Sequence, residues 1–86
     1  MRSQNVHNNS AVYKSEVKIV FDRLKDGPLT KIQAFDELAI FTLAQRIHEL
    51  RKSGYDIRSE MIPIETAKGL RQIAEYTLIS EGVNHA

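Results

Sequence analysis

Apolar residues recur at helical spacing along the first half of the chain. A first helix, beginning near Ser15, is predicted by positions at i, i+3, i+4 and i+7, namely Val17, Val20, Phe21 and Leu24. The Asp-Gly-Pro sequence at 26–28 ends this helix. Glycine permits a left-handed exit from a helix, and proline cannot continue one.

Two shorter helices follow. Thr30 is a candidate N-cap for a second helix over residues 31–38, whose apolar positions are Ile32, Phe35, Leu38 and Ala39. A third helix is predicted by Leu43, Ile47 and Leu50, and Gly54 closes it after a last turn that contains Arg51 and Lys52. Their close spacing along the chain is typical of a helix-turn-helix unit. All three phenylalanines, Phe21, Phe35 and Phe41, are expected in the core.

Beyond Gly54 the apolar period changes to two. Residues 55–61 alternate as a half-buried strand, and Pro63 marks an edge or a bulge. Residues 65–72 are expected to form a turn segment, and residues 73–78 a second strand. Tyr55 and Tyr76 are expected to pack in the core or on the sheet. The pattern predicts an α+β domain of three helices and a two-stranded β-hairpin over residues 14–79, with flexible tails over 1–13 and 80–86.

Composition limits the class of protein. The 86 residues are 42% hydrophobic and 27% charged, which suits one small soluble domain. Cysteine is absent, which excludes disulfides and thiolate metal ligands. No apolar run could cross a bilayer and no secretory signal is visible, so we expect a cytoplasmic protein without a membrane partner, lying with the nucleoid of a bacterial host cell. The net charge of +1 is too small to identify a nucleic-acid partner, so the placement of charges matters more.

Catalytic and metal-binding patterns are missing from the sequence. His7, His48 and His85 are scattered without metal-ligand spacing, and there is no glycine-rich phosphate loop. We therefore expect no enzyme activity, no metal and no cofactor. His48 has two interpretations, a phosphate contact when it is charged or a partly covered surface residue at the hairpin edge.

The polar side of the third helix carries candidate DNA contacts. Glutamine and arginine pair with adenine and guanine edges in the major groove, and threonine can meet a base or a phosphate. Any surface helix must also display polar residues, so a plain solvent-exposed face remains the alternative. The candidates for base contact are Thr42, Gln45, Arg46 and Glu49, and those nearby for phosphate contact are Lys31, Arg51 and Lys52.

The hairpin adds basic residues at its turn. Lys68 and Arg71 flank Gly69 in a segment expected to project from the sheet. A projecting basic hairpin suits contact with the DNA backbone or the minor groove. Lysine on a hairpin can equally prevent edge-to-edge strand pairing, and the sequence leaves both interpretations open.

The run from Leu29 to Ile57, together with the later sequence Ala-Glu-Tyr-Thr-Leu at 74–78, resembles a family of small winged helix-turn-helix proteins common in tailed phages and prophages. This resemblance implies a DNA-binding fold with the hairpin as its wing. The chain departs from the family pattern at Ala39, where glycine is often found in the turn, and at Gln45, where alanine is frequent.

These observations predict a sequence-specific double-stranded DNA-binding protein, a small phage or prophage transcriptional regulator with its third helix in the major groove. One module buries little surface on DNA, so a homodimer or adjacent cooperative copies are expected. The alternative is a winged-helix module that binds a host or phage protein, favoured by Glu49 and by apolar residues of the hairpin, Ile62, Ile64 and Leu70. An excisionase-like DNA architectural factor is a further alternative.

Overall fold

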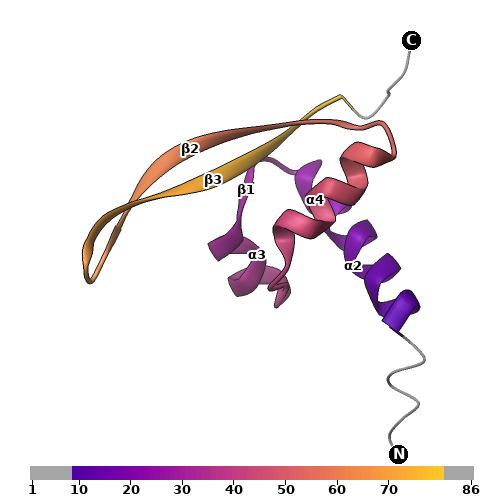
Figure 1. The fold of residues 1–86 in the computed structure, drawn as a ribbon, viewed down its shortest axis with the longest axis horizontal. Helices are drawn as coiled ribbons and strands as arrows, with labels where there is room; N and C mark the ends of the chain where they lie inside the picture. The colour runs from indigo at the N-terminus through magenta and orange to yellow at the C-terminus, as the bar shows by residue number, and fades with distance from the viewer. Residues whose placement is uncertain (1–8, 81–86) are drawn as a thin grey trace, which may run out of the picture.

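The structure is a computed structural model that describes residues 9–80, with side chains described for residues 15–79. The elements are, in chain order, α2 (Asn9–Leu24), β1 (Leu29–Thr30), α3 (Lys31–Leu38), α4 (Leu43–Lys52), β2 (Asp56–Thr66) and β3 (Gly69–Ser80) (Figure 1). Across this part of the chain the expected order of three helices and then a hairpin is confirmed. None of these helices is long and apolar enough to cross a membrane. The tail predictions for residues 1–8 and 81–86 lie outside the described residues.

Helix α2 is longer than its apolar stripe predicts. It begins at Asn9 rather than near Ser15, so residues 9–13, which were expected to be part of a tail, are helical. Residues 11–14 contain neither glycine nor proline, so the helix extends back to the asparagine-rich segment without a break. Its C-terminus is as expected, because the chain turns at Gly27, where φ is +144°.

Helix α3 has the predicted bounds and a full capping box. The Thr30 side chain accepts from the backbone N–H of Gln33 at 3.2 Å, and the Gln33 side chain accepts from the backbone N–H of Thr30 at 3.0 Å. At the other end Ala39 takes the left-handed conformation, with φ 57° and ψ 33°. Its N–H donates to the carbonyl of Phe35 at 2.9 Å, so alanine makes the turn where the family often has glycine.

The buried side of α3 differs from the prediction. Ala34 is fully buried, whereas Ile32 and Phe35 are about half exposed. Phe41, in the turn before α4, is 78% exposed. The core assignment of Phe35 and Phe41 is therefore wrong, because α3 packs on the core through Ala34 and Phe41 lies outside the core in the turn.

The core lies between the three helices and the base of the sheet. Its buried members are Val20, Leu24, Leu29, Ala34, Ile40, Leu43, Ile47, Leu50 and Ile57. Phe21 and Tyr55 cover this core from outside, with their ring centroids 4.7 Å apart, and Tyr76 packs against it from the sheet. The packing positions expected for both tyrosines are confirmed, and Phe21 is partly buried at the core boundary.

The sheet has three strands in the order β1-β3-β2. The two-residue strand β1, which the sequence pattern did not indicate, pairs Leu29 with Tyr76 and Thr30 with Glu75. Strand β2 is at an edge, as Pro63 predicts, and Pro63 lies opposite Gln72 in regular register. The irregularity in the ladder falls instead between Asp56 and Ile57.

The hairpin is longer and its turn tighter than predicted. Only Ala67 and Lys68 form the turn, so most of the expected turn segment 65–72 belongs to strands. The Thr66 hydroxyl donates to the carbonyl of Gly69 at 2.7 Å and accepts from the N–H of Lys68 at 3.1 Å. Gly69 has φ +106°, which favours glycine there. The two strands consequently extend well past the helices as a curved arm (Figure 1).

Candidate nucleic-acid interface

Helix α4 turns one side to the core and the other to solvent. Leu43, Ile47 and Leu50 are 1–3% exposed and fix the orientation of the helix. The opposite side carries the exposed residues Ala44, Gln45, His48 and Lys52. Because these residues lie within one stripe of the helix, their side chains are available together to a partner.

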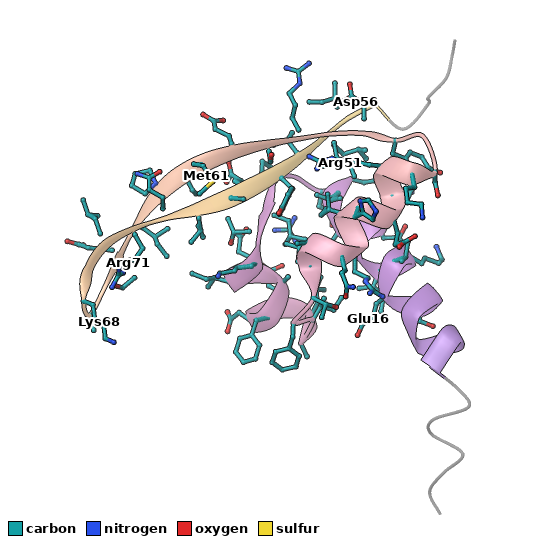
Figure 2. The ribbon with its side chains drawn as sticks, viewed as in Figure 1. Glu16, Arg51, Asp56, Met61, Lys68 and Arg71 are labelled. Carbon is teal, nitrogen blue, oxygen red and sulfur yellow. The ribbon has the colours of Figure 1, made fainter. Side chains whose placement is uncertain are left out.

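Arg46 does not lie on that outward side. It is 7% exposed, and its Nη1 is 3.9 Å from Oε1 of Glu16 on α2. Figure 2 shows Glu16 in the space between α2 and α4. Arg46 Nη2 also donates to Oε1 of Gln45 at 3.4 Å. The expected base contact of Arg46 is thus not supported by its position, because α2 covers this flank of α4 and the guanidinium joins the two helices.

The other predicted base contacts divide by exposure. Thr42 is exposed at the N-cap of α4, and its side chain makes no capping hydrogen bond. Gln45 is exposed one turn later, whereas Glu49 is half-buried on the flank that Arg46 occupies. The predicted base contacts therefore form a stripe that is rotated toward α2 relative to the exposed side of α4. The sequence of α4 alone does not reveal that α2 covers this flank.

His48, for which the sequence allowed a phosphate contact or a partly covered position at the hairpin edge, was not among the predicted base contacts. It is exposed, and it lies three positions after Gln45 and four before Lys52. This spacing puts all three side chains on one helix face. The same spacing is visible in the sequence. It identifies an exposed face only once the buried side of α4 is known.

The cations at the end of α4 have different environments. Arg51 Nε and Nη2 both donate to the carbonyl oxygen of Ile57, at 3.0 and 2.7 Å. Arg51 therefore ties the end of α4 to the start of β2, beside the labelled Asp56 in Figure 2. Lys52 is exposed next to it. Of the two predicted phosphate contacts at this end of α4, Arg51 is engaged with the carbonyl of Ile57, whereas the exposed side chain of Lys52 is available to a phosphate.

A hollow of about 410 Å³ lies between the N-terminus of α4 and the inner face of the hairpin. Lys31, at the start of α3, is the only charged residue in its lining, and no carboxylate belongs to it. The remaining lining residues are Phe41, Thr42, Leu43, Ala44, Gln45, Met61, Gln72, Ile73, Ala74 and Tyr76. Two predicted base contacts and one predicted phosphate contact thus share this hollow.

The outer face of the hairpin has the opposite charge character. Glu60 and Glu75 are direct cross-strand partners, and directly paired residues share one face of a sheet. Their neighbours Met61 and Ala74, also paired, line the hollow on the other face. The carboxylates of this sheet segment therefore lie away from the hollow.

The predicted wing cations lie far from α4. Lys68 occupies the turn and Arg71 lies on β3 opposite Ile64, near the tip of the arm (Figure 2). Both are exposed, but Arg71 belongs to a strand and not to the loop expected from the sequence. These two charges extend the candidate surface along the hairpin beyond the helices.

The fold and this arrangement agree with one family comparison. The family model described as a winged helix-turn-helix domain matches residues 16–81, which is most of the chain. Among curated proteins and among solved structures, no significant match to the chain was found. The match spans α3, the turn at Ala39, α4 and both hairpin strands. The chain belongs to the winged helix-turn-helix domain family.

Proposed function

We propose that the protein binds double-stranded DNA, with α4 in the major groove. The observation that carries this proposal is the exposed stripe of Gln45, His48 and Lys52 on the second helix of a helix-turn-helix unit. Second helices of such units dock in the major groove with their N-terminal residues on base edges. Glutamine is suited to adenine, and the neighbouring Thr42 can contact a base or a phosphate.

Phosphate contacts surround this stripe in the proposed complex. Lys31 lies in the acid-free hollow beside the N-terminus of α4, and Lys52 lies at the other end of the exposed stripe. Lys68 and Arg71 reach the backbone or the minor groove through the hairpin arm. Such contacts supply affinity and orientation, while the side chains on base edges supply the sequence preference.

The finer proposal is a sequence-specific transcriptional regulator of a phage or prophage that acts in the bacterial cytoplasm. The resemblance of residues 29–57 to small phage proteins supports the origin. A homodimer or adjacent cooperative copies are part of the proposal, because a single small module buries less surface than specific regulators usually need.

Selection of bound duplexes from a random pool, at about physiological salt, tests the proposal. Specific binding must exceed the electrostatic, sequence-independent component under this condition. We expect one enriched motif, and a palindrome would indicate a dimer. Lys52→Ala should weaken binding, whereas the matched control Arg58→Ala should not, because Arg58 lies beside the carboxylates of the outer hairpin face. A folded protein that enriches no motif would contradict the proposal.

A protein-binding module is the second candidate function, and the hairpin arm favours it. Leu70 is 70% and Met61 is 57% exposed on the hairpin arm, while Ile62 and Ile64 are half-buried. Apolar surface of this kind is suited to a protein partner. Salt dependence separates the candidates, because DNA affinity falls steeply with ionic strength and apolar docking does not.

A further inference from the structure

An apolar patch lies at the turn of the helix-turn-helix unit, formed by Ile32, Phe35 and Phe41. These residues are 47%, 54% and 78% exposed, and no other large apolar side chain among residues 15–79 is as exposed as Phe41. The rings of Phe35 and Phe41 pack with their centroids 5.0 Å apart at 54°. Phe35 thus supports the Phe41 ring and limits the orientations that the exposed ring can take.

This patch is continuous with the proposed DNA-binding surface. Phe41 lines the large hollow together with Thr42 and Gln45, and a second, smaller hollow with Lys31, Ile32, Phe35 and Ile40. Lys31 is the only charged residue in either lining. A surface that combines an exposed aromatic ring with one cation and no carboxylate is complementary to a polyanion that presents apolar groups.

The edges of base pairs in the major groove present one such apolar group, the 5-methyl group of thymine. Phe41 precedes the first residue of α4 by two positions, and the N-terminus of the recognition helix is the part that approaches base edges. We propose that Phe41 contacts a thymine methyl group, so that the protein prefers a thymine beside the base pair that Gln45 contacts. This inference rests on the proposed DNA-binding function.

Removal of single methyl groups from the selected duplex tests the contact. Each thymine is replaced in turn by uracil, which keeps the hydrogen-bonding groups and lacks only the methyl. At one thymine the wild-type dissociation constant should rise about three- to fivefold, the loss expected for one methyl group removed from an apolar contact. Phe41→Ala should weaken binding to the thymine duplex by at least this factor and should not respond to uracil at that position.

Two further variants control for general effects. Leu70→Ala removes another highly exposed apolar side chain, from the hairpin, and should keep the full response to uracil. Phe41→Leu keeps an apolar side chain at this position, so its affinity should still fall on replacement of the thymine by uracil, but by less than that of the wild type. Circular dichroism checks that each variant is folded, which is expected because the substituted side chains are exposed.

The possible failures are distinguishable. A wild-type protein that selects one motif but tolerates uracil at every thymine would overturn the thymine contact and leave the proposed function intact. Selection of no motif would overturn both. A third outcome is that uracil has no effect, and that sedimentation without DNA shows a wild-type oligomer that Phe41→Ala dissociates. The patch would then be covered by a second copy of the chain, and the thymine contact would be overturned.

Discussion

The helical half of the molecule and the outer part of its hairpin are built on different principles. The helices share one continuous core, in which Val20, Leu29 and Ala34 are fully buried. In the distal hairpin, which we define as residues 61–74, Ile73 is the only buried side chain. Two-stranded ribbons without further packing are marginally stable in water. The comparison indicates that the helices hold α4 in a fixed orientation, whereas the distal hairpin can adjust its path to a bound partner.

The largest expected effect is on the stability of the helical half. Ile47→Ala should lower the free energy of unfolding by about 2–5 kcal/mol, because it leaves a cavity at a site that is 1% exposed. Leu70→Ala in the distal hairpin should change it by less than about 0.5 kcal/mol. Urea unfolding followed by circular dichroism measures both. Similar losses for the two variants would show that side chains of the distal hairpin contribute as much to stability as those of the core, which would contradict the difference between the two regions.

The next effect concerns the contact between α2 and α4. Arg46→Ala should destabilise the fold by about 1–3 kcal/mol, since it removes a buried side chain and leaves Glu16 without its guanidinium partner. In a double-mutant cycle, Glu16→Gln should cost much less in the Arg46→Ala background than in the wild type. The preferred DNA motif should stay the same in Arg46→Ala. Because Arg46 also donates to Gln45, a changed preference at a base pair other than the one that Gln45 contacts would return Arg46 to the base-contacting surface.

These two predictions separate what the sequence indicates from what it does not. The bounds of α3 follow from local chemistry, because Thr30 and Gln33 form a capping box within the same segment. Which side of α3 and α4 is buried depends instead on neighbouring elements. The apolar stripe that contains Ile32 and Phe35 could have been buried. Helix α3 instead packs on the core through Ala34, and Ile32 and Phe35 remain about half exposed.

The hairpin illustrates the same division. The alternation of apolar residues predicts both strands, and Pro63 correctly indicates the edge. The turn was predicted too long, because Glu65, Leu70 and Gln72 do not alternate clearly, and only the cross-strand register assigns them to strands. For the candidate interface, Gln45 and Lys52 were predicted from residue type and lie on the exposed side of α4, whereas the outward position of His48 required the packing of α4.

A smaller effect is expected from the tip of the distal hairpin. Lys68→Ala should weaken binding to all duplexes by about the same factor and reduce the dependence of log affinity on log salt by about one unit, as expected for one lost phosphate contact. Gln45→Ala is the matched change on α4 and should instead relax the preference at one base pair. Titrations at several salt concentrations give both quantities. An unchanged salt dependence for Lys68→Ala would place the hairpin tip away from the DNA backbone.

The smallest effect concerns the surface ion pair that joins α3 to α2. Arg23 Nε donates to Oε1 of Glu37 at 2.8 Å, and this hydrogen bond holds the pKa of Glu37 below its ordinary value of 4.5. A carboxylate with a lowered pKa in the folded state stabilises the fold at pH values above 4.5, and this stabilisation is lost as the pH falls through the lowered value. Glu37→Gln should therefore be slightly less stable than the wild type at pH 7, and the difference should disappear in acid.

Unfolding of both proteins between pH 7 and pH 2 measures this difference, with Asp36→Asn as the control on the same helix. The Glu37 carboxylate is largely in water, so the difference at pH 7 should be much smaller than the loss in Ile47→Ala. If Glu37→Gln were as damaging as Ile47→Ala, the attachment of α3 would depend on its surface ion pair and not on the burial of Ala34. The fixed orientation of the helix-turn-helix unit would then depend on pH, unlike an orientation held by an apolar core.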